Sequence, residues 1–249
     1  MPVALSTTDL VVDHGPLRAL DGVSIEVPVG STVAVIGPNG SGKSTLLKTI
    51  AGILTPSRGR VEVRGPAPAI VLQSTEVDRS VPISVRDTVA MARYPSLGLF
   101  GRYGADDRAV VDEALARLDL TDLADRPIHQ LSGGQRQRVL VAQGIAQRAP
   151  LLLLDEPLTG LDVRSRSIIT DALDDEHRHG RTLISTTHNF RDAEQADLVL
   201  LLATRCVAYG APAEVLTEEH LREAFGGRFV RVGDTLLLDD PHHDPANRR

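Results

Sequence analysis

The sequence Gly-Pro-Asn-Gly-Ser-Gly-Lys-Ser at residues 37–44 constrains the fold more than any other feature, because it matches the pattern G-x-x-x-x-G-K-[ST]. Residues 31–36 before it end in four apolar residues and predict a buried strand, and a helix predicted over residues 43–54 follows it. Strand, glycine-rich turn and helix in this order form a phosphate-binding loop. The glycines let backbone N–H groups point at phosphate oxygens, and the helix N-terminus adds partial positive charge. An ordinary glycine-rich turn is the alternative, which the flanking elements disfavour.

The remaining pattern predicts an α/β chain with a helical insertion. Apolar or alternating runs predict strands at residues 23–27, 69–72, 151–154, 182–185, 198–202 and 206–209. Helical periodicity predicts helices over residues 106–118 and 163–177, and Thr121 is expected to cap a short helix between them. Strands that alternate with helices imply a mostly parallel sheet. The insertion, at about residues 74–145, separates two strand-rich parts of the chain.

Composition and charge limit the classes of function. The 249 residues fit one domain, and 27 basic against 33 acidic residues give a net charge of −6. This balance argues against a nucleic-acid-binding protein, which needs a basic surface. One cysteine, Cys206, excludes an intrachain disulfide and favours a reducing compartment. No apolar run approaches the ~18 residues that cross a bilayer and no secretory signal is visible, so we expect a soluble intracellular protein that only a partner holds at a membrane.

Two carboxylates, Asp155 and Glu156, come directly after the four leucines at residues 151–154. In a parallel sheet, ligands bind at the carboxyl ends of the strands. Asp155 is therefore expected to face a Mg²⁺ bound by the Ser44 hydroxyl, and Glu156 to polarise the water that attacks a γ-phosphate. Lys43 is expected to reach the β- and γ-phosphates. Alone, Asp-Glu-Pro would suit a solvated acidic turn, but the phosphate loop favours the catalytic interpretation.

A second glycine-containing helix start, Leu-Ser-Gly-Gly-Gln at residues 131–135, predicts another anion-binding N-terminus. Two phosphate-binding segments in one chain are unusual for a monomeric ATPase. Together with Gln73 after a strand, Gly-Leu-Asp at residues 160–162 and His188 after a strand, these motifs resemble the ATP-binding cassette (ABC) ATPases over about residues 3–225.

The resemblance implies an α/β P-loop NTPase fold with three parts: a mostly parallel RecA-like core sheet, an N-terminal antiparallel β subdomain and a helical signature subdomain. It implies a single domain, residues 1–249, with the core at about 3–73 and 146–225 and the helical subdomain at about 74–145. C-terminal strands are expected at about 228–238, and a disordered tail at 239–249.

The resemblance also implies residue roles, in a head-to-tail dimer in which the signature of each copy caps the ATP held by the other. The implied catalytic residues are Glu156, His188 and Gln73. His188 would hold the γ-phosphate, and Gln73 would sense Mg²⁺. Asp162 would lie at the dimer seam. Mg²⁺ would be bound by Ser44, Gln73 and Asp155. ATP would be bound by His14, Gly37, Pro38, Asn39, Gly40, Ser41, Gly42, Lys43, Ser44 and Thr45, and the partner's ATP by Leu131, Ser132, Gly133, Gly134 and Gln135.

Several of these positions keep structural alternatives or depart from the family pattern. His188 and Gln73 could be ordinary polar groups at strand ends, and Asp162 could cap the following helix. His14 stands where the family usually stacks an aromatic ring on adenine; we expect it to contact the base, with a solvated loop as the alternative. Asn189 follows His188 where aspartate is more usual. Gly144 lies within a helix, where glycine costs about 1 kcal/mol relative to alanine.

Residues 73–135 are similar to the cassettes of zinc and manganese importers. The implied function is the ATP-hydrolysing subunit of an importer for a divalent metal ion, with zinc ahead of manganese. Its implied partners are a second copy of itself, membrane permease subunits and, indirectly, an extracytoplasmic metal-binding protein, at the cytoplasmic face of the cell membrane. The apolar residues Leu97, Leu99 and Phe100 fit a docking patch for the permease. The alternatives are an iron or iron-chelate cassette and a soluble ABC ATPase that does not transport. His242 and His243 are expected in a solvated tail, with metal binding as the alternative, for which the ligand count is lacking.

Overall fold

The structure is a computed structural model that describes residues 2–72, 83–97, 101–226, 229–232 and 235–238. Its centre is a six-stranded sheet with the order β5-β6-β7-β3-β8-β9. The strands are β3 (Thr32–Ile36), β5 (Ala69–Val71), β6 (Leu151–Leu154), β7 (Thr182–Thr186), β8 (Leu198–Ala203) and β9 (Arg205–Gly210). All neighbours are parallel except β9, which pairs antiparallel with β8. The predicted mostly parallel core sheet is confirmed.

The four leucines of β6 show why a parallel strand is an uninterrupted apolar run. Successive side chains of a strand point to opposite faces of the sheet, and both faces are covered here. Leu151 and Leu153 pack into a cluster shared with the N-terminal sheet and the first helix. Leu152 and Leu154 pack into a second cluster, formed mainly by the helical insertion. One strand thereby contributes side chains to both of these apolar clusters.

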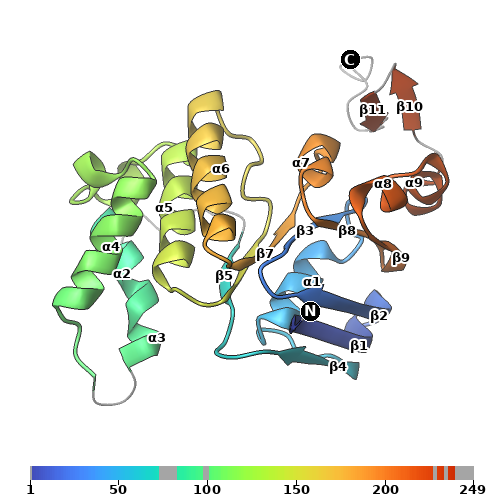
Figure 1. Ribbon diagram of the computed structural model, residues 1–249, viewed down its shortest axis with the longest axis horizontal. Coiled ribbons are helices and arrows are strands. Elements are labelled where there is room, and N and C mark those ends of the chain that lie inside the picture. The colour runs from blue at the N-terminus through green and yellow to red at the C-terminus, as the bar shows by residue number, and fades with distance from the viewer. Residues whose placement is uncertain (1, 73–82, 98–100, 227–228, 233–234, 239–249) are drawn as a thin grey trace.

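The N-terminal part forms the predicted antiparallel sheet, with the order β2-β1-β4. Its strands are β1 (Val3–His14), β2 (Leu17–Pro28) and β4 (Arg58–Val63). Helix α1 (Lys43–Ile50) lies between this sheet and the core sheet (Figure 1) and buries Leu46, Leu47 and Ile50 in the cluster that both sheets share. The helix predicted to reach residue 54 ends at Ile50, where Ala51 closes its last turn.

The helical insertion and α6 lie together beyond the β5 edge of the core sheet, as Figure 1 shows. Its elements are α2 (Val85–Ala90), η1 (Met91–Arg93), α3 (Tyr94–Leu97), α4 (Ala105–Arg117), η2 (Thr121–Leu123), η3 (Ile128–Gln130) and α5 (Gly133–Ala146), followed later in the chain by α6 (Val163–Arg178). Thr121 was expected to cap a short helix, and this prediction is wrong. Its backbone carbonyl closes the 3₁₀ turn by accepting from Ala124 N, and no side-chain bond caps η2.

The C-terminal part covers one face of the core sheet at β3, β8 and β9. Helices α7 (Phe190–Glu194), α8 (Pro212–Val215) and α9 (Glu218–Phe225) pack into a third apolar cluster, and the hairpin β10 (Phe229–Val232) and β11 (Thr235–Leu238) follows. Gln73, Leu99, Phe100 and the tail from residue 239 lie outside the described residues. No helix within the described ranges is long and apolar enough to cross a bilayer.

Candidate nucleotide site

The phosphate loop joins the carboxyl end of β3 to the first turn of α1. Gly42 occupies the N-cap position of α1 with φ 96°, a left-handed conformation that favours glycine. The Lys43 ammonium curls back over the loop and donates to the carbonyls of Gly37, at 2.8 Å, and Pro38, at 3.0 Å. Burial lowers the pKa of Lys43, while the nearby charges of Glu156 and Asp155 oppose that shift. A buried cation and a helix N-terminus therefore meet at one point, which suits an anionic ligand.

Asp155 and Glu156 follow β6, which lies two strands from β3 in the sheet. Asp155 is buried, its backbone N–H donates to Val71 O, and its Oδ1 accepts from the Thr186 hydroxyl at 2.8 Å. Glu156 adopts a left-handed backbone with φ 51°, and its N–H donates to the same Thr186 oxygen at 2.8 Å. Thr186 is the last residue of β7, the strand between β6 and β3. The strand order thus brings both carboxylates toward the lysine.

His188 follows β7 and contacts Glu156 through its Nε2 and the carboxylate Oε1. The backbone around it is fixed: Asn189 N donates to the Thr187 hydroxyl, and the Asn189 side chain caps α7 by accepting from Arg191 N. Asparagine at position 189 therefore fills a capping role that aspartate could also fill. An imidazole at hydrogen-bond distance from a carboxylate can hold that carboxylate in one orientation and present its other nitrogen to a ligand.

The hydroxyl and carboxylate oxygens at this edge suit Mg²⁺. Ser44 is exposed at the start of α1, and the Thr186 hydroxyl orients the Asp155 carboxylate by donating to its Oδ1. Mg²⁺ prefers hard oxygen donors and usually combines one or two protein ligands with phosphate oxygens and water. The described residues contain no group of three or more His, Cys, Asp or Glu side chains that could hold a metal by themselves. The donor set therefore fits a magnesium ion bound together with a nucleotide.

His14 lies at the end of β1 and reaches the phosphate-loop helix. Its Nε2 is 3.3 Å from the Thr45 hydroxyl, and its ring is exposed. Asp13 beside it accepts from the Ser57 hydroxyl and from Arg18, and these hydrogen bonds lower the pKa of Asp13. The imidazole therefore lies next to the phosphate loop, at an end of β1 that the hydrogen bonds of Asp13 stabilise. This position is compatible with the expected contact to the base of a nucleotide.

The signature residues form a second cluster, built on two other helices. Ser132 caps α5 and accepts from Gln135 N at 3.2 Å, while the Gln135 side chain accepts from Ser132 N. Asp162 caps α6, and the Ser165 backbone N–H and hydroxyl hold its pKa below the ordinary value. A Cβ on Gly134 would lie 2.9 Å from Asp162 Oδ2. The structure thus places the signature directly against the residue predicted at the dimer seam.

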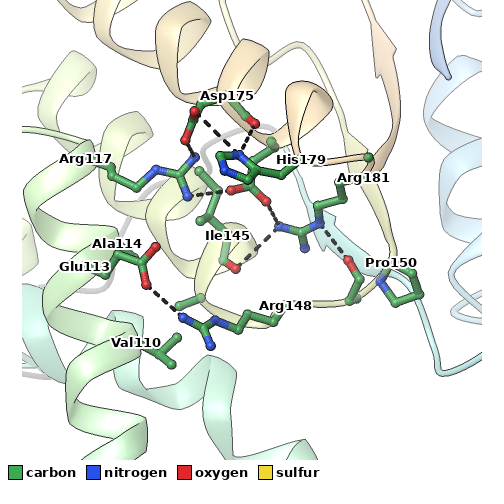
Figure 2. A pocket seen from close by; sticks show the side chains of 14 residues that line it. Val110, Glu113, Ala114, Arg117, Ile145, Arg148, Pro150, Asp175, His179 and Arg181 are labelled. Atoms are coloured by element: carbon green, nitrogen blue, oxygen red, sulfur yellow. Dashed lines mark hydrogen bonds and ion pairs between the residues drawn. The ribbon is translucent and has the colours of Figure 1, made fainter. Parts of the chain in front are cut away.

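A separate pocket of about 390 Å³ opens where α4, the end of α5 and the end of α6 meet (Figure 2). The buried guanidinium of Arg181 donates to the carbonyls of Gly144 and Ala149 and pairs with Glu176 at 2.6 Å. Arg117 of α4 pairs with the same Glu176 and with Asp175. Because carboxylates already neutralise these arginines, the pocket is a polar junction between helices. It lies where β7 begins, away from the strand ends that carry Asp155 and His188.

Sequence reasoning missed two residues that this geometry brings out. Thr186 received no role, although its place between an apolar strand and His188 was a signal that it faces the site. Gly144 had no explanation: a Cβ there would lie 2.5 Å from the Val71 side chain, so glycine lets α5 approach the core sheet. Cys206 is partly buried, and burial raises its pKa.

Known proteins are similar to this chain along most of its length. A family profile described as "ABC transporter" matches residues 20–159. The manganese transport system ATP-binding protein MntA of Synechocystis is 37% identical, over 91% of this chain and 94% of its own length. The zinc transport system ATP-binding protein TroB of Treponema pallidum is 39% identical, over 94% of this chain and 90% of its own. A metal-chelate type ABC transporter solved in an inward-facing conformation aligns with a TM-score of 0.81 at 32% identity, covering 95% of this chain and 96% of that one.

Proposed function

This chain belongs to the ABC transporter family as an ATP-binding, ATP-hydrolysing subunit, and we propose that in this role it drives the import of a divalent metal ion, with zinc as the first candidate. The observation that carries the ATPase part is the meeting of Lys43, Asp155, Glu156 and His188 at the carboxyl ends of β3, β6 and β7. Similarity to manganese, zinc and metal-chelate systems supports a metal cargo.

The proposed chemistry assigns one task to each group. The loop amides and Lys43 bind the phosphates of ATP, and His14 contacts its base. Glu156 polarises the attacking water, while His188 orients Glu156 and holds the γ-phosphate. Mg²⁺, held by Ser44, Asp155 and Gln73, would neutralise phosphate charge when bound.

The proposed assembly is a head-to-tail dimer of this chain with ATP at the interface, docked on membrane permease subunits at the cytoplasmic face of the cell membrane. The signature, residues 131–135, would cap the partner's ATP from its helix N-terminus. Asp162, which lies against Gly134, would then stand at the seam. An extracytoplasmic metal-binding protein would supply the ion. In this arrangement the domain layout, with a helical subdomain at about 74–145, gives the permease a separate surface to contact.

The elemental content of cells with and without this protein, grown under metal limitation, tests the cargo. A selective fall in zinc supports the proposal and fixes the direction of transport. A fall in manganese or in iron would support metal import but make that ion, and not zinc, the cargo. The manganese and metal-chelate relatives favour this alternative. If no metal changes while purified protein hydrolyses ATP, metal import is wrong and a soluble, non-transport ABC ATPase becomes the better assignment.

A further inference from the structure

The hydroxyl of Thr186 lies between the two carboxylate residues of the site. It accepts from Glu156 N at 2.8 Å and donates to Asp155 Oδ1 at 2.8 Å. The direction of both bonds is determined, because a backbone N–H can only donate and an ionised carboxylate can only accept. The side chain is fully buried, so water does not compete for either bond.

Through one oxygen atom, Thr186 therefore constrains both the backbone of Glu156 and the carboxylate of Asp155. It holds the backbone of Glu156 in a left-handed conformation, with φ 51°, from which the carboxylate reaches His188. It also donates to Oδ1 of Asp155 and so fixes the orientation of that carboxylate. A base is effective only within hydrogen-bond reach of its water, so a small displacement of Glu156 should cost turnover more than ATP binding.

We propose that Thr186 is a positioning residue for ATP hydrolysis, which sets the orientation of Glu156 and Asp155 through its hydroxyl. The inference rests on the proposed role of Glu156 as the group that polarises water. It predicts a requirement for a hydroxyl at position 186, because valine has the same shape but neither donates nor accepts. Groups that support a catalytic ligand in this way typically contribute 10–100-fold, roughly.

The chain offers a matched control on the same strand. Thr182 is also buried in β7, and its hydroxyl accepts from Gly30 N at 2.9 Å, at the opposite end of the strand. Thr182→Val therefore removes a buried hydroxyl and leaves a backbone N–H without its partner, as Thr186→Val does, but away from the site. Loss of stability alone should affect both variants alike.

The experiment measures kcat and KM for ATP of the purified full chain, together with Tm, for Thr186→Val, Thr186→Ser, Thr182→Val and Glu156→Gln. We expect Thr186→Val to lower kcat by about 10–100-fold with KM changed by less than about 2-fold. Thr186→Ser, which keeps the hydroxyl, should recover kcat to within about 3-fold of the original chain. Thr182→Val should lower Tm but retain kcat.

The outcomes separate this inference from the proposed function. If Thr186→Val keeps kcat within about 2-fold while Glu156→Gln is inactive, Thr186 does not position the site and the role of Glu156 stands. If Glu156→Gln hydrolyses ATP at the original rate, Glu156 is not the group that polarises water, and the positioning role of Thr186 is wrong as well. Equal loss of kcat in Thr182→Val and Thr186→Val also overturns the inference. Should Thr186→Val not fold, Thr186→Cys, with a weak thiol donor, replaces it; turnover at the original rate would then overturn the inference.

Discussion

Glu156 combines an unfavourable backbone with a favourable set of partners. Its φ of 51° costs a residue with a Cβ about 1–2 kcal/mol, and such conformations persist where the surroundings fix them. Here the fixing contacts are the Thr186 hydroxyl on its N–H and His188 on its carboxylate. The Glu156 carboxylate also lies close enough to the phosphate loop for its charge to oppose the lowering of the pKa of Lys43 by burial.

Replacing Glu156 with glutamine should leave ATP binding intact and remove hydrolysis. The amide keeps the shape but cannot polarise water as a carboxylate does, so turnover should fall by about 10²–10⁴-fold. With ATP and Mg²⁺ the variant should persist as a dimer in size-exclusion chromatography. Glu113→Gln, on the exposed face of α4, is the matched control and should turn over normally. A Glu156→Gln protein that hydrolyses ATP as a monomer would contradict the mechanism.

Tyr209 gives the fold a pH dependence unrelated to catalysis. Its hydroxyl donates to Glu26 O at 2.7 Å and so ties β9 to the N-terminal sheet, and burial raises its pKa from 10.0 to about 12. Because the folded pKa lies above the unfolded one, this contribution to stability is complete below pH 10 and is lost as the pH rises toward 12. Urea unfolding of Tyr209→Phe should show a smaller decline in the free energy of unfolding between pH 9 and 11 than the original chain shows. Identical declines in both proteins would contradict this assignment.

At the scale of elements, α5 is the helix that connects the signature to the core sheet. It begins at the Ser132 cap and ends beside β5 and β6, where Gly144 permits close approach. The same glycine's carbonyl accepts from Arg181 at 3.0 Å. The approximately 1 kcal/mol that glycine costs within a helix is therefore offset by contact with the sheet.

Adding a methyl group at Gly144 should destabilise the protein although alanine favours helices. The new Cβ would lie 2.5 Å from Val71 Cγ2 and 3.1 Å from Leu152 Cδ1, and both are buried side chains on strands. Overpacking of this kind costs about 1–3 kcal/mol in the free energy of unfolding. Gly144→Ala combined with Val71→Ala should cost less than the sum of the two single changes, because the smaller strand residue makes room. Additive single effects in urea titrations would mean that the two residues do not compete for space.

The sequence predicted the elements best where a continuous or periodic run of apolar residues packs into the core. The strands with continuous apolar runs, such as β6 and β8, and the helix α6 were predicted within two residues of their ends. Thr121 failed as a cap because backbone bonds alone satisfy that short turn. The contacts that Thr186 and Gly144 make could not be predicted from local pattern, since the order of strands in the sheet brings their partners, Asp155 and Val71, beside them.

At the scale of the whole molecule, an ion-pair network fastens the helical insertion to the core. Figure 2 shows Arg117 and Arg181 converging on the end of α6. Both arginines pair with Glu176, whose side chain is 12% exposed, and Arg117 also donates to Ala172 O. Burial lowers the pKa of Arg181, while Glu176 counteracts that shift. One glutamate thus joins α4, α6 and the start of β7.

Removing that glutamate's charge should destabilise the whole chain. In Glu176→Gln the guanidinium of Arg181, 7% exposed, would lose its carboxylate, and breaking a buried pair in this way costs about 3–5 kcal/mol. Asp175→Asn is the matched control on the same helix: its pair with Arg117 is more exposed and should contribute less than about 1 kcal/mol. Urea unfolding measures both. A loss for Glu176→Gln no larger than that for Asp175→Asn would show that the network does not anchor the insertion.

The strand order also has a consequence for biosynthesis. Within the described residues, β3, the strand that carries the phosphate loop, pairs with β7 and β8, and both leave the ribosome after the whole helical insertion. Val33, for example, cannot form its strand pairs until Ile184 and Leu198 have been synthesised. Until then the nascent chain exposes an unpaired apolar strand, the kind of intermediate that invites aggregation and chaperone binding. The phosphate loop, although it is encoded near the N-terminus, therefore gains its supporting sheet only late in synthesis.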